Sequence, residues 1–125
     1  MSSATEVIAC IRSGDVEQLN RLLAADPAAA NRVDDRGFTP LTMAAYLGNL
    51  PAVRALVEAG ADLNAQDRAG NTALMGVCFK GNVDIARYLV EAGADTTVTG
   101  ATGADARAFA EQYGHGEIVA LLDKR

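Results

Sequence analysis

Apolar and polar positions recur along this chain with a fixed period. The run Leu-Val-Glu-Ala-Gly-Ala-Asp at residues 56–62 returns unchanged at residues 89–95. The run Gly-Phe-Thr-Pro-Leu at residues 37–41 returns as Gly-Asn-Thr-Ala-Leu at residues 70–74, in the same register. The interval between the two copies is 33 residues (89 − 56 = 33). A repeat of this length is typical of stacked, quasi-linear proteins, in which each unit buries its apolar face against its neighbours.

Glycines keep the same register as the apolar runs. The series that repeat at this constant interval are Gly37, Gly70 and Gly103, then Gly48, Gly81 and Gly114, then Gly60 and Gly93. Gly14 precedes Gly48 by slightly more than the interval, so an extra residue is expected within residues 24–28. We therefore expect a single domain over residues 1–125 with four units. These are an N-terminal cap at 1–33, two regular repeats at 34–66 and 67–99, and a C-terminal cap at 100–125.

Each unit is predicted to form a helix, a tight turn, a second helix and an extended loop. Thr39 and Thr72 are suited to N-cap a first helix, because a hydroxyl can accept from an otherwise unpaired N–H of the first turn. Asp105 takes this place in the last unit, and Pro40 falls at the first helical position, where its missing N–H costs nothing. The first helices are expected at residues 5–13, 40–47, 73–80 and 106–113, and the second helices at 16–25, 50–58, 83–91 and 117–123.

The two central units carry the motifs of a known family. The run at residues 37–45, Gly-Phe-Thr-Pro-Leu-Thr-Met-Ala-Ala, is similar to the Gly-x-Thr-Pro-Leu-His-x-Ala-Ala motif of ankyrin repeats. Residues 60–64, Gly-Ala-Asp-Leu-Asn, resemble the family's Gly-Ala-Asp-x-Asn run, and the likeness extends from Glu6 to Leu122. It implies an all-α ankyrin-repeat solenoid of helix-turn-helix units. First helices would line a concave face, second helices a convex face, and the loops would form β-hairpin-like fingers.

Two features depart from the family's pattern. Thr42 and Met75 stand where the family usually has His, so the hydrogen bonds that this His makes between repeats are expected to be absent. Arg107 stands where the earlier units have Leu41 and Leu74. A buried Leu position that becomes Arg predicts that this side of the last unit faces water, as a terminal cap should.

The resemblance also implies a place for a partner, because ankyrin repeats generally bind proteins with the concave face and the fingers. The positions free to vary there directly precede the glycine that ends each first helix, or lie at the finger tips. The candidate partner-binding residues are Arg12, Asp35, Arg36, Phe38, Tyr46, Leu47, Arg68, Asn71, Phe79, Lys80, Gln112 and Tyr113.

Aromatic residues recur at one structural position among these candidates. Tyr46, Phe79 and Tyr113 all lie near the ends of three predicted first helices, and Phe38 adds a ring on the finger above. Exposed aromatic residues beside Arg are typical of interface hot spots. The alternative is that these rings pack between adjacent helices and only complete the core.

Composition excludes several classes of function. Half of the residues are hydrophobic, which supports a core, but aromatics make up only 5% and Trp is absent, so small residues must do much of the packing. The net charge of −5 and the lack of a Lys/Arg cluster argue against nucleic acid and anionic membrane surfaces as partners. The sequence shows no signal-peptide pattern and no apolar stretch of about 18 residues, so we expect a cytoplasmic protein.

Charge is predicted to differ between the two faces. The second helices are mostly acidic, whereas the candidate binding side has more cations than acids. This pattern favours a partner segment with some acidic character, because such fields steer encounters; an ordinary solvated surface would explain it equally well. The charged residues on the binding side are Arg12, Arg36, Arg68 and Lys80, against Asp35 and Glu111.

Residue patterns for catalysis or metal binding are missing. His115, the only histidine, lies in a predicted turn with no nucleophile spaced to meet it. His115, Cys10 and Cys78 together give only three possible zinc ligands, and they lie in different units. A structural zinc site needs four ligands. The two cysteines lie two units apart, which is too far for a disulfide, and both occupy positions that pack between helices. We therefore expect buried, unpaired thiols. Residues 99–103 lack the strand and Lys of a phosphate-binding loop. We expect no catalytic residue, metal, cofactor or small-molecule substrate.

The function predicted from the sequence is a protein-protein interaction module that binds one protein partner and acts as a monomer. A narrower alternative is an inhibitor or antidote that blocks an enzyme or a toxin. A second alternative is an accessory protein that stabilises a partner enzyme. An enzymatic function of its own has no support in the sequence.

Overall fold

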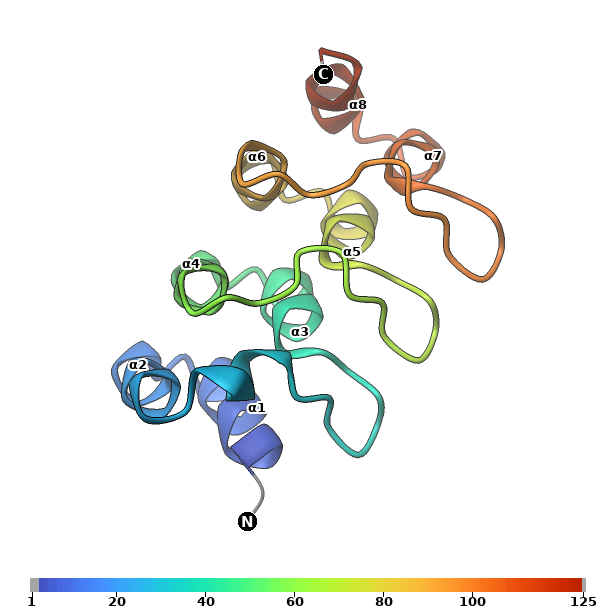
Figure 1. Ribbon diagram of the computed structural model, residues 1–125. Helices are drawn as coiled ribbons and strands as arrows, with labels where there is room; N and C mark the ends of the chain where they lie inside the picture. Colours follow the sequence, from blue (N-terminus) through green and yellow to red (C-terminus); the bar gives the residue numbers. More distant parts are fainter. Residues whose placement is uncertain (1–2, 125) are drawn as a thin grey trace.

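The helices are stacked in two columns. The computed structural model describes residues 3–124, and over that range it contains eight α-helices, one 3₁₀-helix and no strand. First helices form one column, second helices the other, and the loops project to one side (Figure 1). The predicted all-α solenoid of helix-turn-helix units is confirmed. The bounds are α1 Ser3–Ser13, α2 Val16–Ala25, η1 Pro27–Asn31, α3 Pro40–Tyr46, α4 Leu50–Glu58, α5 Ala73–Lys80, α6 Val83–Glu91, α7 Ala106–Gln112 and α8 Gly116–Asp123.

Side-chain caps begin most of these helices. Thr39 and Thr72 accept hydrogen bonds from the backbone N–H three residues further on, and Asp105 does the same at the start of α7. These three caps were predicted. Asn49 and Asn82, which hold equivalent positions in successive units, cap α4 and α6 in the same way. The helix starts are therefore encoded locally, by residues that satisfy N–H groups of the first turn.

The 3₁₀-helix η1 was not predicted. Later units have Gly60 or Gly93 after the second helix, with positive φ angles that allow a tight turn. The first unit has Asp26 and Pro27 there, and the ring of Pro27 fixes a φ angle suited to starting a helical turn. Helix ends also differ from the prediction by one or two residues, as α1 begins at Ser3 and α3 ends at Tyr46.

Small residues let the helices approach closely along each column. Ala44 and Ala45 in α3, and Ala110 in α7, have no exposed surface. Helix α3 packs on α1 and α5, α5 packs on α7, and the second helices pack on one another in the same order. The buried side chains therefore form one continuous core along the stack. The absence of Trp is compensated by this close helix–helix contact.

Equivalent hydrogen bonds link neighbouring units outside the core. The Asn31 side-chain oxygen accepts from the backbone N–H of Asp62 at 2.7 Å, and Asn64 accepts from Asp95 at 2.7 Å. Each bond joins one unit to the next, 31 residues along the chain. Since the same pair recurs one repeat later, these bonds help to hold the register of the stack.

The three fingers are closed loops. We define them as residues 32–39, 65–72 and 98–105. In each finger one backbone N–H donates to the carbonyl four residues later, as from Asp34 to Phe38 at 3.1 Å. One such bond is too little for a ladder, so the predicted hairpin-like loops contain no strand within residues 3–124.

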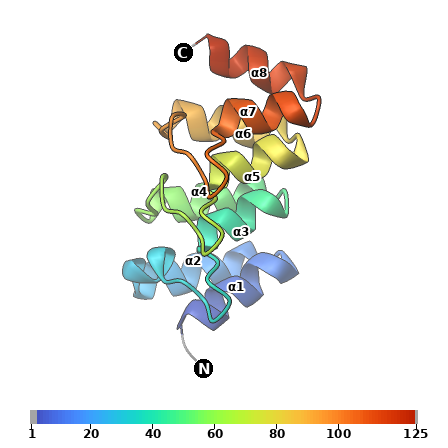
Figure 2. The same cartoon turned by 90° about the vertical axis from the view of Figure 1, so that its right-hand side faces the viewer.

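Neighbouring fingers lie one above the other (Figure 2). The backbone N–H of Arg68 in the second finger donates to the carbonyl of Gly37 in the first at 3.0 Å. Gly37 has a φ of 86°, and a Cβ added there would lie 2.6 Å from the Arg68 Cβ. Glycine is thus required both for the backbone conformation and for the close approach of the two fingers.

The last unit in residues 3–124 carries a charged cluster on its outer side. Arg107 is exposed and donates to Asp123 at 2.7 Å and to Glu111 at 2.7 Å. The equivalent Leu41 and Leu74 are buried, so the prediction that this side of the last unit faces water is confirmed. The bonds to the two carboxylates raise the pKa of the Arg107 guanidinium, and the bond from Arg107 lowers the pKa of Asp123.

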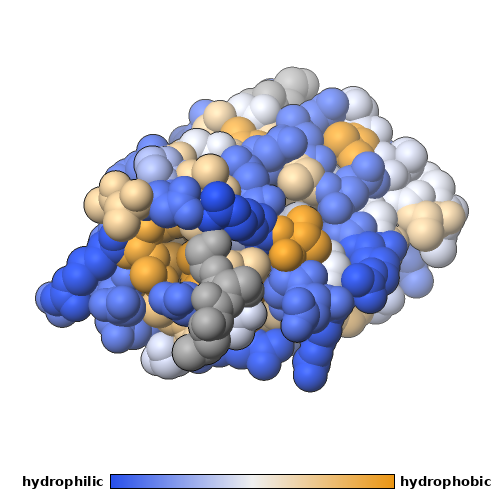
Figure 3. Space-filling model, turned by 60° about the horizontal axis from the view of Figure 1, so that its bottom comes forward, coloured by the Kyte–Doolittle hydropathy of each residue, from blue (hydrophilic) through white to orange (hydrophobic). Residues whose placement is uncertain are grey.

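The outer surface is largely polar. Seen from the N-terminal end of the stack, hydrophilic residues predominate and hydrophobic patches are separated by them (Figure 3). No helix within residues 3–124 combines the length and apolarity needed to cross a bilayer. The large hydrophobic side chains that are exposed in this range are Val33, Tyr46, Leu47 and Tyr113. Three of these four are candidate binding residues, so the exposed apolar surface is concentrated on the predicted binding side.

Candidate functional site

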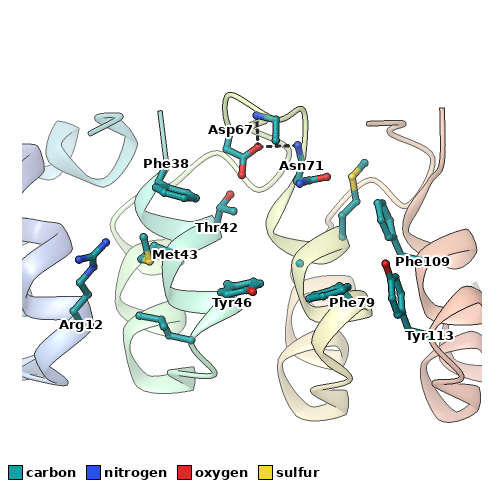
Figure 4. A pocket seen from close by; sticks show the side chains of 14 residues that line it. Arg12, Phe38, Thr42, Met43, Tyr46, Asp67, Asn71, Phe79, Phe109 and Tyr113 are labelled. Atoms are coloured by element: carbon teal, nitrogen blue, oxygen red, sulfur yellow. Dashed lines mark hydrogen bonds between the residues drawn. The ribbon is translucent and has the colours of Figure 1, made fainter. Parts of the chain in front are cut away.

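A groove of about 710 Å³ lies on the face formed by the first helices. Helices α1, α3, α5 and α7 all contribute to it, and the first two fingers border one edge (Figure 4). Arg12 lies at one end and Tyr113 at the other. Most of the lining side chains are apolar. A mostly apolar hollow with a few polar groups is the usual form of a binding site.

Three aromatic rings line the groove as a continuous series. The rings of Tyr46 and Phe79 are stacked, with centroids 6.3 Å apart and planes within 5°. Phe79 meets Tyr113 edge-on at 4.6 Å. Tyr46 and Tyr113 nevertheless stay 43% and 44% exposed. The rings therefore pack on one another, as the structural alternative predicted, and still present apolar surface to solvent.

Gly76 opens the groove in the middle. It lies on α5 at the position that Met43 occupies on α3 and Phe109 on α7, one repeat period away in each direction. A Cβ added at Gly76 would meet nothing within 4 Å. The missing side chain thus leaves a space between Met43 and Phe109 that no neighbouring residue fills.

Polar groups at the finger edge are arranged by Asp67. Its carboxylate accepts from the backbone N–H groups of Ala69 and Asn71 at 3.0 and 2.9 Å, which holds the turn of the second finger (Figure 4). The side-chain amide of Asn71 lines the groove and makes no hydrogen bond with any residue that the structure describes. It is available to a bound molecule, while the charge of Asp67 is stabilised by backbone amides.

Cations around the groove are left without acidic partners. Within residues 3–124, ion pairs occupy arginines away from the groove, whereas Arg12, Arg36, Arg68 and Lys80 form none. The Lys80 ammonium lies 4.8 Å from the centre of the Tyr46 ring, and an Arg68 N–H donates to the Asp35 carbonyl at 3.2 Å. Of the nearby acids, Glu111 is paired with Arg107, whereas Asp35 forms no ion pair within residues 3–124. The potential around the groove is therefore more positive than the net charge of −5 implies.

Comparison with known proteins identifies the fold. A family model of ankyrin repeats, in three copies, matches residues 7–100. The chain belongs to the ankyrin repeat family. The resemblance inferred from residues 37–45 and 60–64 is thereby confirmed, and this family typically provides non-catalytic interaction modules.

Several curated ankyrin repeat proteins are similar over part of the chain. Rat ankyrin repeat and SAM domain-containing protein 6 is 38% identical over 59 residues, which are 47% of this chain and 7% of that protein. The human DNA-binding protein RFXANK is 43% identical over 49 residues, 39% of this chain and 19% of that protein. Mouse protein phosphatase 1 regulatory subunit 27 is 39% identical over 54 residues, 43% of this chain and 35% of that protein. The matched segments thus span a minor part of these relatives.

The ankyrin stack brings seven of the candidate residues together around the groove. Those that line it are Arg12, Phe38, Tyr46, Leu47, Asn71, Phe79 and Tyr113. A smaller hollow of about 260 Å³ near the first finger is lined by Arg12, Asp35 and Arg36 among others. Arg68, Lys80 and Gln112 line neither hollow, although Lys80 covers the Tyr46 ring.

Seven other residues line the groove and are not among the candidates. They are Thr42, Met43, Asp67, Ala69, Met75, Gly76 and Phe109. For Thr42 and Met75 the sequence predicted only the loss of the family's His. The signal that could have identified Gly76 was the register itself, since the series Met43, Gly76 and Phe109 has equal spacing and unequal side chains. The open space at Gly76 depends on how three helices pack together, and this packing cannot be derived from the spacing alone.

Groups with chemical reactivity are engaged structurally. Cys10 and Cys78 are buried free thiols, as predicted. Burial raises the pKa of the Cys78 thiol to about 12, and it also raises that of Cys10. His115 donates from Nε2 to the Phe79 carbonyl at 3.0 Å and so links the last two units, which the sequence did not predict. Among the described residues, no three metal-ligating side chains are close enough to hold an ion.

Proposed function

We propose that this ankyrin stack is a non-catalytic interaction module that binds one protein partner in the groove. The observation that carries the proposal is the partly exposed aromatic series Tyr46, Phe79 and Tyr113, which lies across three units on one apolar face. Packed aromatic side chains that retain exposure are the common anchors of protein interfaces. We further propose that residues 1–125 act as one four-unit domain, as a monomer in the cytoplasm.

The exposed parts of the rings can contribute binding energy. Burying a large side chain fully gives about 1.5–3 kcal/mol relative to full exposure, so the exposed parts of two tyrosines offer about 2 kcal/mol. Tyr46 and Tyr113 keep less than half of their surface exposed, so little further ordering is needed on binding. Rigid aromatic groups lose little conformational entropy when a partner covers them.

A protein is favoured over nucleic acid as the partner. One human relative is named as a DNA-binding protein. This chain has a net charge of −5, and the cations near its groove are dispersed over α1, the first two fingers and α5. Nucleic-acid binding usually relies on clustered cations that neutralise successive phosphates. Another relative is named as a regulatory subunit of a phosphatase, which is compatible with regulation of a partner enzyme.

The test compares capture of a partner by wild type and by the double variant Tyr46→Ala/Phe79→Ala. We expect the double variant to lose about 2 kcal/mol or more, which is about thirtyfold in affinity. Tyr88→Ala is the matched control, because Tyr88 lies on α6 under Arg54 and away from the groove. Circular dichroism must show that all variants are folded.

A folded double variant that holds the same partner at full affinity would contradict the proposal. The activity of the captured partner, measured with and without this chain, then separates the possible roles. Loss of the partner's activity would indicate an inhibitor or antidote, and increased stability of the partner would indicate an accessory protein. An unchanged activity would indicate an adaptor.

A further inference from the structure

We propose that the groove binds an extended, acidic segment of the partner, with one large apolar side chain inserted over Gly76. This inference rests on the proposed function and specifies the chemistry of the bound segment. Three observations support it: the space at Gly76, the length of the groove, and the unpaired cations around it.

The space at Gly76 is suited to an apolar anchor. Met43 and Phe109 occupy the equivalent positions on either side, and both line the groove with Met75. Since a Cβ at Gly76 would meet nothing within 4 Å, a side chain from a partner can occupy the place where this chain has none. Walls made of Met and Phe select for apolar surface and adapt to its shape.

The groove is long enough for an extended segment. It runs from Arg12 on α1 to Tyr113 on α7, across three successive helix–helix spacings (Figure 4). At about 8–10 Å for each spacing, this is roughly 24–30 Å. An extended peptide of about nine residues, at about 3.3 Å each, covers that length. The free side-chain amide of Asn71 lies along the path and can pair with a peptide bond.

The charges around the groove favour acidic residues beside the anchor. Arg12 and Arg36 form no ion pair within residues 3–124, and neither do Arg68 and Lys80. The carboxylate of Asp67 already accepts two backbone N–H groups, and Glu111 is paired with Arg107. Asp35, which lines the smaller hollow with Arg12 and Arg36, forms no ion pair within residues 3–124, and the four unpaired cations outnumber it. Dispersed unpaired cations at a rim complement a peptide with a few carboxylates, and they mainly steer its approach and set its salt dependence.

The first experiment identifies the preferred segment without knowledge of the partner. A phage-displayed library of random peptides about nine residues long is selected on the immobilised full chain. We expect the enriched peptides to contain one large apolar residue with Asp or Glu on either side. Enrichment of basic peptides, enrichment without an apolar residue, or no enrichment at all would overturn the proposal.

The second experiment tests where the enriched peptide binds, by fluorescence polarisation with a labelled copy. Gly76→Met places in the groove the side chain that the preceding unit has at Met43, and we expect it to weaken binding by at least about tenfold. Ala120→Met adds the same side chain at an exposed position of α8 and should leave the affinity unchanged. Gly76→Ala controls for loss of the glycine, because it leaves most of the space open. Equal affinity of Gly76→Met and wild type would overturn the assignment of the anchor.

The third experiment tests the role of charge. The pair Arg12→Gln/Arg36→Gln should weaken the acidic peptide about five- to tenfold at low salt, and by less at about 0.5 M salt. The matched control is Arg54→Gln/Arg87→Gln, which removes two cations from the second helices. Equal effects of the two pairs would overturn the acidic part of the proposal.

The natural partner distinguishes this inference from the proposed function. If the Tyr46→Ala/Phe79→Ala variant no longer binds the partner but Gly76→Met binds it at full affinity, the proposed anchor at Gly76 is wrong and the proposed function is retained. If neither variant changes the affinity for the partner, the groove is not the binding site and both proposals are wrong. Reduced binding by both variants supports both.

Discussion

Gly76 within helix α5 and Gly81 at its C-terminal cap should respond to the same substitution in opposite directions. Gly76 is an interior residue of α5, with no positive φ angle and open space where a Cβ would lie. Gly81 caps the same helix with φ 87°. A Cβ at Gly81 would lie 2.5 Å from the ring of His115, whose Nε2 donates to the Phe79 carbonyl. Replacing each by Ala therefore compares a position where nothing opposes a Cβ with one where both the backbone conformation and a close contact oppose it.

The magnitudes follow from these two environments. Gly76→Ala should stabilise the fold by about 0.5–1 kcal/mol, since it gains helix propensity and restricts the unfolded chain. Gly81→Ala incurs about 1 kcal/mol or more for the left-handed conformation. It also displaces His115, whose lost hydrogen bond adds about 0.5–1.5 kcal/mol. The expected destabilisation is therefore about 1.5–2.5 kcal/mol or more.

Urea and thermal unfolding followed by circular dichroism measure both effects. We expect Gly76→Ala to raise Tm by about 2–5 °C and Gly81→Ala to lower it by about 6 °C or more. The dependence of the unfolding free energy on urea should be the same for all three proteins. A neutral Gly81→Ala, or a destabilised Gly76→Ala, would refute the conformations assigned to these two positions.

Three further predictions concern the end of the stack and its titratable groups. Deleting residues 100–125 should cause aggregation or a sharply lower Tm in a thermal melt, because α7 and α8 cover the core of the preceding unit; an unchanged Tm would contradict the capping role. Burial raises the pKa of Cys78 to about 12, so its thiol should stay protonated at about pH 8, and in a Cys10→Ser variant thiol labelling should await unfolding in urea; rapid labelling of that folded variant would be inconsistent with the burial of Cys78. The pKa of Asp123 is lowered in the folded state by the bond from Arg107, so its stabilising contribution is present above the unfolded pKa of 3.8 and is lost as pH falls through the folded value. The urea midpoints of wild type and Asp123→Asn should therefore converge as the pH falls below 3.8, and a constant difference would exclude this linkage.

Much of the fold could be predicted because its determinants are local and repeated. The caps at Thr39, Thr72 and Asp105 each act within one turn of helix, so the residue type and its position suffice to predict them. The 3₁₀-helix η1 was missed because the register predicted a turn where Pro27 favours a helical one. The packing of the units against one another could be predicted from the period, since equivalent residues of successive units must meet.

The candidate site was predicted only in part. Repeat positions correctly placed Tyr46 and Phe79 on one face, because residues one period apart on successive first helices align. Tyr113 is one residue out of this register and meets Phe79 edge-on. Arg68 and Gln112 do not line the groove, and the Arg68 side chain donates instead to the Asp35 carbonyl, a contact between two fingers that the sequence does not predict. The link between His115 and Phe79 was also missed, because it joins residues 36 positions apart.

The sequence by itself determined the period, the helices, their caps and the family, since each is a property of a contiguous segment or of its recurrence. Tertiary structure alone decided the shape and charge of the groove. Its depth depends on the volumes of Met43, Gly76 and Phe109 taken together across three helices. Its potential depends on which carboxylates lie close enough to neutralise a cation, and that distance is set only when the units are stacked.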